Sequence, residues 1–364
     1  MCRAVRGTWI LKRLWKRFTN AANRVRGAET ECVRVRDTIA LNPVTNPSKT
    51  LSTRVLIAFA CVYLFWGSTY LAIRFGVQVL SPYMLGSVRF LIAGPLMLGL
   101  CAARGLRLRQ SWRDLGLLAT IGILMLDIGN MGLVWCEQYL PSGLAALLYA
   151  VIPVYVGLIE VFLPGGEGLR AKGWFGIAIG FAGLVVLLSP GLRAGLHGAG
   201  GQLMASIVAV TSALAWTFGS VLSRRAKLKA GAFVAAAWEM LFAGIFNFGL
   251  LLAIQGPRGL RDAHWSRQGF WSIAWLVTFG SLVGYSAYIY LLDHVPVAKV
   301  STYAYVNPVV AVILGAIFLR ERMVGIEYAG MAAILIAVYL VTSSKLRSGA
   351  STAQLECVEA EPPN

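Results

Sequence analysis

Charged side chains are scarce in this chain. Only 13% of its 364 residues are Asp, Glu, Lys or Arg, whereas 57% are hydrophobic, and the mean hydropathy is +0.68. A folded chain of this composition has too little polar surface to cover a water-soluble globule. The composition therefore excludes a soluble protein and indicates one that resides in lipid.

Paired cysteines and clustered histidines are also lacking. The six cysteines are scattered without a Cys-x-x-Cys pair or a nearby histidine, and the three histidines fall in or beside predicted loops. This pattern excludes a disulfide framework and a zinc site. The sequence has no phosphate-binding loop, dinucleotide fingerprint or His-Glu-x-x-His motif. We therefore expect no catalytic residues, no metal and no cofactor, and predict that the protein is not an enzyme.

Long apolar runs dominate the rest of the sequence. A bilayer core about 30 Å thick takes roughly 20 apolar residues per helix. Ten such segments are separated by short charged loops: 55–75, 82–103, 115–136, 142–163, 173–189, 202–222, 232–254, 270–292, 297–319 and 325–343. They predict an all-α integral membrane protein with ten transmembrane helices.

The membrane region consists of two copies of one unit. At an offset of 155 residues Pro296 and Pro308 match Pro141 and Pro153, and at an offset of 150 Trp216 matches Trp66. Such self-similarity indicates a tandem duplication. We divide the chain into residues 1–54, a first five-helix repeat at 55–190, a second at 200–343, and a tail at 344–364.

Lys and Arg are distributed unequally between alternate loops. With the N-terminus in the cytoplasm, the inside loops and C-terminal tail carry thirteen and the outside loops six. This excess predicts that both termini are cytoplasmic. Because each repeat has five helices, an odd number, the second must enter the membrane upside down relative to the first. The repeats are therefore predicted to be inverted, an architecture typical of secondary transporters.

Residues 1–54 contain twelve Lys or Arg against three acidic residues. Residues 9–18 place aromatic and leucine side chains on one helical face and basic ones on the other, so they could form an interfacial helix on anionic lipid. The alternative is a disordered basic cytoplasmic extension. Because the charge lies in one tail and in loops, we expect no nucleic-acid partner.

Several motifs resemble a known family. They are Phe65-Trp-Gly-Ser-Thr-Tyr-Leu-Ala-Ile-Arg74, Val88-Arg-Phe90, Leu140-Pro-Ser-Gly-Leu-Ala145 and Ser301-Thr-Tyr-Ala-Tyr-Val-Asn-Pro-Val-Val-Ala311. They occur in the order found in EamA-type transporters of the drug/metabolite transporter (DMT) superfamily, which the sequence resembles over residues 56–343. The resemblance implies ten helices, a central cavity lined mainly by helices other than the fifth and tenth, and export of small metabolites or drugs from a bacterial cytoplasm. The turn containing Glu167 departs from the pattern that Glu321 follows.

The sequence therefore predicts an exporter of the inner membrane that works by alternating access without ATP. Amino acids or their derivatives are the favoured small-molecule substrates, membrane lipid is the surrounding partner, and the chain acts as a monomer or homodimer. Coupling to protons, facilitated diffusion and exchange all fit. An importer, a polytopic membrane enzyme and a scaffold without transport are the alternatives.

Ionisable residues inside the spans are costly to bury and need partners. Arg89 and Glu239 occupy repeat-related positions, so we predict a contact between them that changes between conformational states. The alternative is that Arg89 extends to the membrane interface and that Glu239 is held by local hydroxyl groups. Asp127 and Asn130 share a face of the third helix, where the carboxylate could bind a cationic group or a proton, or simply pack. Glu137 is expected at the interface, at the end of that helix.

Proline and aromatic residues complete the candidate cavity. Pro153 and Pro308 each free a backbone carbonyl, and we expect the same helix break in both repeats. Aromatic rings around them could sandwich an amphipathic solute. The candidate cavity residues are Trp66, Ser68, Thr69, Arg89, Asp127, Asn130, Tyr149, Pro153, Trp216, Glu239, Tyr285, Tyr288, Tyr303, Tyr305, Asn307 and Pro308. Gly176, Gly180 and Gly183 are expected to pack the fifth helix against the tenth or against a partner chain.

Overall fold

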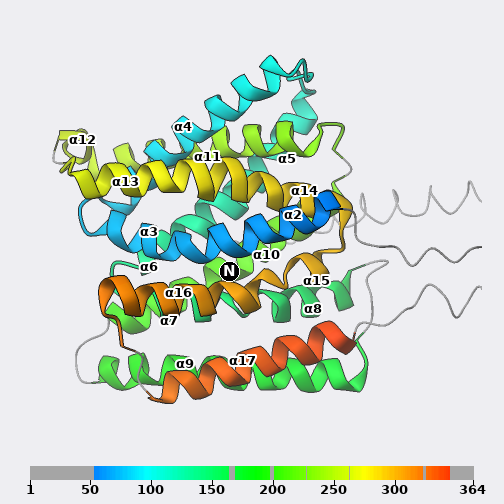
Figure 1. Ribbon diagram of the computed structural model, residues 1–364, viewed down its shortest axis with the longest axis vertical. Coiled ribbons are helices and arrows are strands. Elements are labelled where there is room, and N and C mark those ends of the chain that lie inside the picture. The colour runs from blue at the N-terminus through cyan, green and yellow to red at the C-terminus, as the bar shows by residue number, and fades with distance from the viewer. Residues whose placement is uncertain are drawn as a thin grey trace, which may run out of the picture. The chain divides into compact units, whose positions relative to one another are not determined.

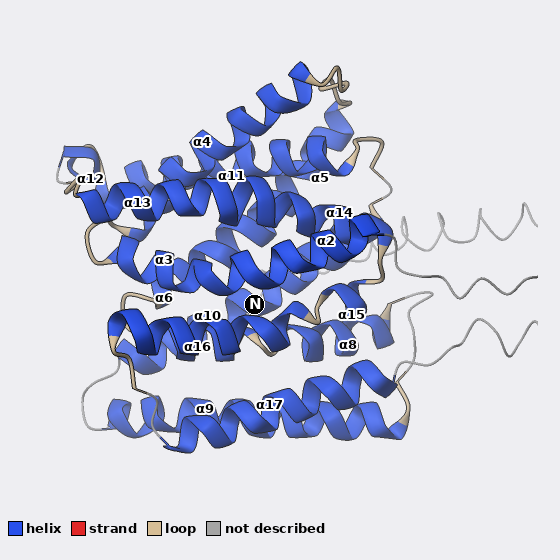
Figure 2. Cartoon of the chain, in the orientation of Figure 1, coloured by secondary structure: helices blue, strands red, loops and turns tan. Residues whose placement is uncertain are grey.

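A computed structural model describes residues 53–163, 169–196, 201–226, 228–261, 263–322 and 325–344. The chain divides into residues 1–50 and 51–364, and all described residues belong to the second unit. In these described ranges the chain is helical and contains no β-strand (Figure 2). Residues 1–52 of the basic extension lie outside the described residues, so neither the disordered segment nor the interfacial helix at 9–18 is tested. Glu167 also lies outside them.

The ten expected spans are present, each within a few residues of its expected ends. The first repeat contains α2 (Thr53–Cys61), η1 (Val62–Trp66) and α3 (Gly67–Val77); α4 (Pro82–Ala103); α5 (Trp112–Gly122), η2 (Ile123–Met131) and α6 (Gly132–Cys136); α7 (Ser142–Tyr149) and α8 (Ile152–Phe162); and α9 (Ala171–Leu196). The second contains α10 (Gly201–Arg225); α11 (Ala232–Gln255); α13 (Arg267–Trp275), η3 (Leu276–Tyr285) and α14 (Ser286–His294); α15 (Val297–Val300) and α16 (Tyr303–Leu319); and α17 (Gly325–Ser344). Nine of these described spans have the length and apolar composition to cross a bilayer, and Gly325–Val341 is a shorter apolar helix.

The two repeats run in opposite directions. The fourth span of the first repeat lies beside the fourth span of the second, with α7 against α16 and α8 against α15 (Figure 1). Because α7 precedes α8 whereas α15 precedes α16, these repeat-related spans are antiparallel. This arrangement is the one expected of inverted five-helix repeats.

Small residues bring α4 and α11 into close contact. A Cβ atom on Gly94 would lie 2.7 Å from the backbone nitrogen of Leu241, and one on Gly244 would lie 2.7 Å from that of Leu91. At each glycine, the backbone of the partner helix from the other repeat occupies the space that a side chain would fill. The reciprocal packing shows why Ala-Gly occurs at the same place in both repeats, since only glycine permits this approach in lipid.

The fifth and tenth spans, α9 and α17, pack against each other at the lower edge of Figure 1. Gly176 faces Leu340, Gly180 faces Ala337, and Gly183 approaches the backbone of Gly330. The expectation that the glycines of the fifth helix pack against the tenth is thereby confirmed.

Three spans contain π-helical segments, η1, η2 and η3. The segments η2 and η3 lie in the repeat-related third and eighth spans, and η1 ends at Trp66. A π-helical turn widens the backbone and leaves some carbonyl groups free for other partners, so such turns are frequent at functional sites. Here they provide several residues of the central site described below.

The expectation that Pro153 and Pro308 break both repeats at the same point is wrong. The fourth span breaks at residues 150–151, and Pro153 lies in the first turn of α8, where its missing N–H has no intrahelical acceptor to lose. The ninth span breaks at residues 301–302, and α16 continues through Pro308. The offset of 155 residues that matches Pro153 to Pro308 would place the break of the fourth span at residues 305–306 of the ninth. The breaks in the two repeats are therefore not at equivalent positions.

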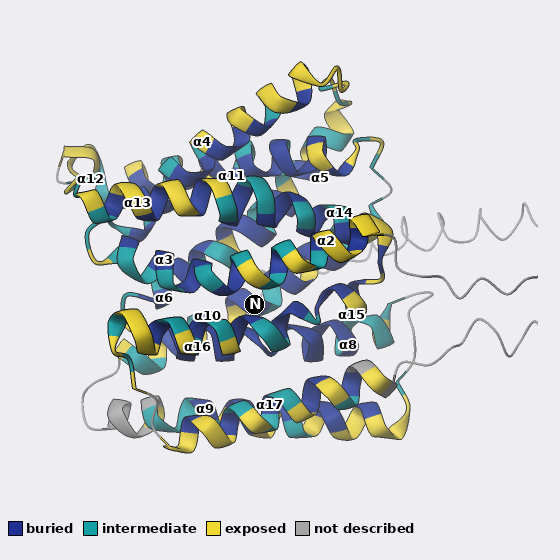
Figure 3. Ribbon diagram, in the orientation of Figure 1, coloured by how far each residue is buried: buried dark blue, intermediate teal, exposed yellow. Residues whose placement is uncertain are grey.

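Exposed residues lie along the outer faces of the helices (Figure 3). Many of them are large and apolar. Ile245 and Phe246 of α11, Ile317 and Phe318 of α16 and Tyr339 of α17 are all more than a third exposed. In water such a surface would promote aggregation, whereas in a bilayer it meets lipid chains of the same polarity. The protein is therefore a multi-pass membrane protein.

Candidate substrate cavity

A small cavity of about 40 Å³, with both polar and apolar residues in its wall, lies between the two repeats. Its lining residues come from the first, second, third, fourth, sixth, eighth and ninth spans, and none comes from α9 or α17. They are Trp66, Thr69, Tyr70, Arg89, Leu126, Asn130, Leu133, Tyr149, Ile152, Trp216, Gly280, Tyr285, Tyr303 and Asn307. A water needs about 10–15 Å³ measured in this way, so the cavity of this conformation has room for about three waters.

Aromatic rings from both repeats meet at this cavity. The repeat-related Trp66 and Trp216 stand edge to face with centroids 5.4 Å apart. Trp66 lies 4.8 Å from the ring of Tyr288 and 5.3 Å from that of Tyr303, and Tyr285 lies 6.4 Å from Trp216. These distances are those of favourable aromatic pairs. The ring cluster therefore joins the repeats and presents an apolar, polarisable wall.

Arg89 is the cation of the cavity. Its side chain is buried, with 5% of the residue exposed, so it does not extend to the membrane interface. Its Nε donates to the Ser281 hydroxyl at 2.8 Å, and its Nη1 donates to Oδ1 of the Asn130 side chain at 3.1 Å. Gly280 leaves room for the other terminal nitrogen, since a Cβ there would lie 2.9 Å from Nη2.

The predicted partner of Arg89 has another contact in this conformation. Glu239 is fully buried and accepts a hydrogen bond from the Tyr285 hydroxyl at 2.7 Å. No ion pair joins Glu239 to Arg89 among the described residues. An exchange of partners between conformational states stays a prediction.

Asp127 lies behind the cavity wall. It accepts a hydrogen bond from the Asn247 amide of α11, and its other oxygen is buried without a hydrogen-bond partner in the structure. Neither Asp127 nor Glu239 is among the lining residues. Asp127 therefore belongs to the contact between the third and seventh spans and the Glu239 carboxyl to the contact between the seventh and eighth. The cavity itself contains no acidic side chain among the residues described.

The remaining expected residues divide between the cavity and its surroundings. Thr69, Asn130, Tyr149 and Asn307 line it. Ser68 instead lies in an apolar groove on the outer face of α3 and α13, where it accepts a hydrogen bond from the Trp275 indole at 3.0 Å. Outside the cavity lining lie Tyr288 of the ring cluster, Tyr305, Pro153 and Pro308.

Some lining residues were not expected from the sequence. Tyr70 follows Trp66 by one helical turn and could have been found from that spacing. Leu126, Leu133 and Ile152 have no feature that separates them from ordinary packing residues. Gly280 is recognisable only from the backbone of η3, because its carbonyl oxygen accepts a hydrogen bond from Trp66 at 3.0 Å.

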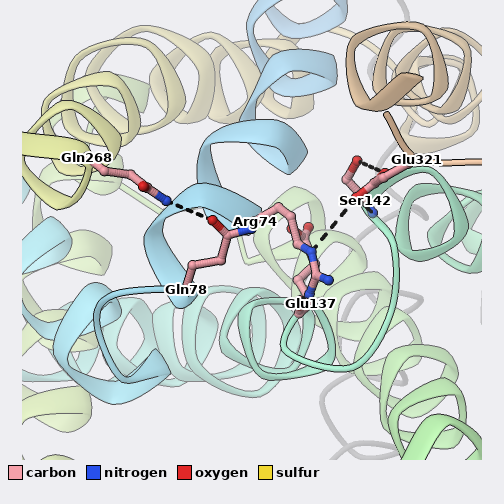
Figure 4. A network of polar contacts seen from close by, with 6 residues as sticks. All are labelled: Arg74, Gln78, Glu137, Ser142, Gln268 and Glu321. Atoms are coloured by element: carbon pink, nitrogen blue, oxygen red, sulfur yellow. Dashed lines mark hydrogen bonds and ion pairs between the residues drawn. The ribbon is translucent and has the colours of Figure 1, made fainter. Parts of the chain in front are cut away.

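Arg74, one helical turn after the cavity-lining Tyr70, belongs to a polar network with Ser142 and Glu321 (Figure 4). The Glu321 carboxylate, in the connection after α16, accepts hydrogen bonds from the backbone N–H of Ser142 at 3.1 Å and from its hydroxyl at 2.7 Å. Arg74 of α3 lies 3.8 Å from the same carboxylate, measured from Nε to Oε1. We call Arg74, Ser142 and Glu321 the latch. It ties the connection after α16 of the second repeat to α3 and α7 of the first.

Glu137 adjoins the latch and is not the interfacial residue expected from the sequence. It is fully buried at the end of α6, and both its carboxyl oxygens lack a hydrogen-bond partner in the structure. Arg74 donates to its backbone carbonyl. Burial raises the pKa of the Glu137 carboxyl well above its usual range, the negative charge of Glu321 raises it further, and the Arg74 guanidinium lowers it. A carboxyl group in this setting favours the protonated form.

The opposite end carries a related contact. Arg224, which matches Arg74 at the 150-residue offset, donates to the backbone carbonyl of Asp293 at 2.6 Å, just as Arg74 donates to that of Glu137. In each repeat, an arginine near the end of the first span thus donates to a backbone carbonyl group at the C-terminal end of the third span and caps that helix. Val297 occupies the position that matches Ser142, so the hydroxyl contact of the latch has no counterpart.

Sequence comparison identifies the family. The profile of the EamA-like transporter family matches residues 53–189 and 203–343, once in each repeat. The chain belongs to the EamA-like transporter family. It is therefore a transporter of the drug/metabolite type, set in a membrane and acting on a small-molecule substrate, and the family and its relatives are named as transporters and not as enzymes.

Relatives extend this result. The "Uncharacterized inner membrane transporter YedA" of Escherichia coli K12 is 38% identical, with 79% of this chain and 90% of that protein covered. The "Probable amino-acid metabolite efflux pump" of the same strain is 23% identical over 77% of this chain and 91% of that protein. A solved structure described as "Crystal structure of protein" matches with a TM-score of 0.59 at 23% identity, covering 81% of this chain and 99% of that chain, which supports the fold.

Proposed function

We propose that the protein exports small organic metabolites, with amino acids or their derivatives favoured, across the bacterial inner membrane by alternating access. The observation that carries the proposal is a narrow cavity between inverted repeats, lined by aromatic rings and one arginine, with the latch one helical turn beyond its lining residue Tyr70. Inverted repeats around a midplane site can exchange conformations so that the site opens to either side in turn.

The cavity volume supports a transport cycle with an occluded state. At about 40 Å³ the cavity is far smaller than the 300 Å³ or more of typical ligand pockets. A metabolite can therefore enter only if the repeats separate. Release of the latch would open the end at which α3 finishes, while separation at the other end requires movement around Arg224.

Export is the favoured direction because one relative is named an amino-acid metabolite efflux pump. The distribution of Lys and Arg between loops favours cytoplasmic termini. In that orientation the latch faces outward. An importer or a facilitative exchanger would use the same architecture, and coupling to protons would then determine the direction.

Metabolite profiling tests the proposal. Growth medium from cells that overproduce the protein, lack it, or produce a latch variant such as Glu321→Ala would be compared by mass spectrometry. We expect a small set of organic metabolites to accumulate outside only with the intact protein. Depletion of those metabolites from the medium would indicate import, and identical media from all strains would contradict a metabolite transporter.

A further inference from the structure

Arg89 has no carboxylate partner in the structure. Its only hydrogen bonds in the described residues go to Ser281 and Asn130, both neutral, and they use Nε and one N–H of Nη1. The guanidinium also makes a cation–π contact with the ring of Phe90, whose centroid lies 4.8 Å from Cζ. The second terminal nitrogen and the edge between Nη1 and Nη2 therefore keep unused donors.

The unused edge belongs to the cavity. Arg89 and Gly280 both line it, and Nη2 packs against Gly280, where an added Cβ would lie only 2.9 Å away. A buried cation in a membrane protein is costly without a counter-ion. Because no Asp or Glu lines the described cavity, the missing negative charge has to come from whatever enters it.

The composition of the walls restricts the class of that anion. One guanidinium neutralises one negative charge, and its planar edge matches the two oxygens of a carboxylate. A phosphate monoester would bring close to two charges and would leave one of them unpaired in a poorly hydrated site. The rings of Trp66, Trp216 and Tyr303, which line the same cavity as Arg89, offer an apolar surface suited to a flat hydrocarbon group.

We propose, on the basis of the transport function proposed above, that the substrate is an organic monocarboxylate with an aromatic or apolar body, and that Arg89 binds its carboxylate. A carboxylate on the substrate is therefore required, whereas an amino group is dispensable. Ser281 and Asn130 are positioning residues, since they hold the guanidinium plane with its free edge toward the cavity.

Three probes with the same phenyl body and different charge test this proposal. Binding of 3-phenylpropanoate, 3-phenylpropanamide and 2-phenylethylamine to the purified full-length protein in lipid nanodiscs would be measured by isothermal titration calorimetry. Counterflow of each probe would be measured in liposomes. We expect the anion to bind and exchange, and the neutral amide and the cation to bind at least about 30-fold more weakly, as expected when a buried ionic contact is lost.

Variants of Arg89 supply the second arm. Arg89→Met should reduce affinity for 3-phenylpropanoate by about 30-fold or more while leaving the weak binding of the amide unchanged, which a misfolded protein would not do. Arg89→Lys should give an intermediate affinity, since it keeps the charge without the planar fork.

Several results would overturn the proposal. They are equal binding of all three probes, preference for the amine, no binding of any probe, and unchanged affinity for the anion in Arg89→Met. Each leaves the transport function to be judged separately by the metabolite profile. A profile in which exported compounds lack a carboxylate would likewise preserve transport and contradict the role of Arg89.

Discussion

The latch should control access to the cavity from the end at which α3 finishes. Glu321→Ala removes two hydrogen bonds from Ser142, at 3.1 Å and 2.7 Å, and the ion pair with Arg74 at 3.8 Å. A hydrogen bond to a charged group contributes about 1.5–3 kcal/mol. The ion pair adds at most about 1 kcal/mol, because its side chains are 26% and 15% exposed and water screens them.

Glu321→Ala should therefore destabilise the conformation in which the latch end is closed by at least about 3 kcal/mol relative to the conformation in which it is open. At 1.4 kcal/mol per factor of ten, the ratio of open to closed molecules rises by about 100-fold or more. Ser142→Ala removes only the hydroxyl contact and keeps the backbone N–H. Its expected loss is about 1.5 kcal/mol, or roughly tenfold. The order of the two variants follows directly from the contacts.

Cysteine labelling measures this shift. In a cysteine-free background, Leu133→Cys places a thiol on the cavity wall one turn below Glu137, and a membrane-impermeant maleimide reports opening in sealed vesicles. The labelling rate should rise in the order parent, Ser142→Ala, Glu321→Ala. Asp114→Ala serves as the control, since it removes a half-buried carboxylate from the first turn of α5, at the other end of the third span from the latch. Unchanged labelling in Glu321→Ala, or an equal rise in Asp114→Ala, would refute the reasoning.

Three further predictions concern other parts of the molecule. Because burial raises the pKa of the Glu137 carboxyl, the free energy of unfolding should fall as pH rises above about 4.3, by up to about 1.4 kcal/mol per pH unit until the folded-state pKa is reached. Glu137→Gln should therefore raise the melting temperature more at pH 8 than at pH 5, and equal increases at the two pH values would contradict a raised pKa for Glu137. Gly94→Ala should destabilise the protein by about 1–3 kcal/mol through overpacking, whereas Gly99→Ala, with nothing within 4 Å of its added Cβ, should be neutral or stabilising in the same thermal melts. Gly280→Ala should weaken anion counterflow at least severalfold by displacing Nη2 of Arg89, and wild-type flux in that variant would show that this space is not used.

Much of the architecture followed from the sequence because its signals are periodic and repeated. The apolar runs located all ten spans, since the bilayer requires helices of a fixed minimum length. The 150-residue offset paired Trp66 with Trp216 and Gly94 with Gly244, and the structure brings both pairs to the contact between repeats. Inversion followed from the odd number of spans in each repeat.

The polar contacts were less predictable because they depend on how helices face one another. Arg89 and Glu239 occupy equivalent positions in the two repeats, yet they do not pair with each other. The Glu239 carboxylate accepts a hydrogen bond from a tyrosine hydroxyl, and the Arg89 guanidinium donates one to a serine hydroxyl. Glu137 looked interfacial by its place at a helix end, but packing against the connection after α16 buries it. The π-helical turns, which carry Gly280 into the cavity wall, leave no distinctive sequence pattern.

The central claim is that the cavity between the inverted repeats carries small organic solutes across the membrane. The most direct test is release of metabolites from liposomes that contain the purified protein and are loaded with a labelled bacterial metabolite extract. We predict that a few organic anions exit, that the same anions added outside accelerate their exit, and that Arg89→Met abolishes the release. Release no greater than from protein-free liposomes, in the parent protein and in the latch variants alike, would contradict the account.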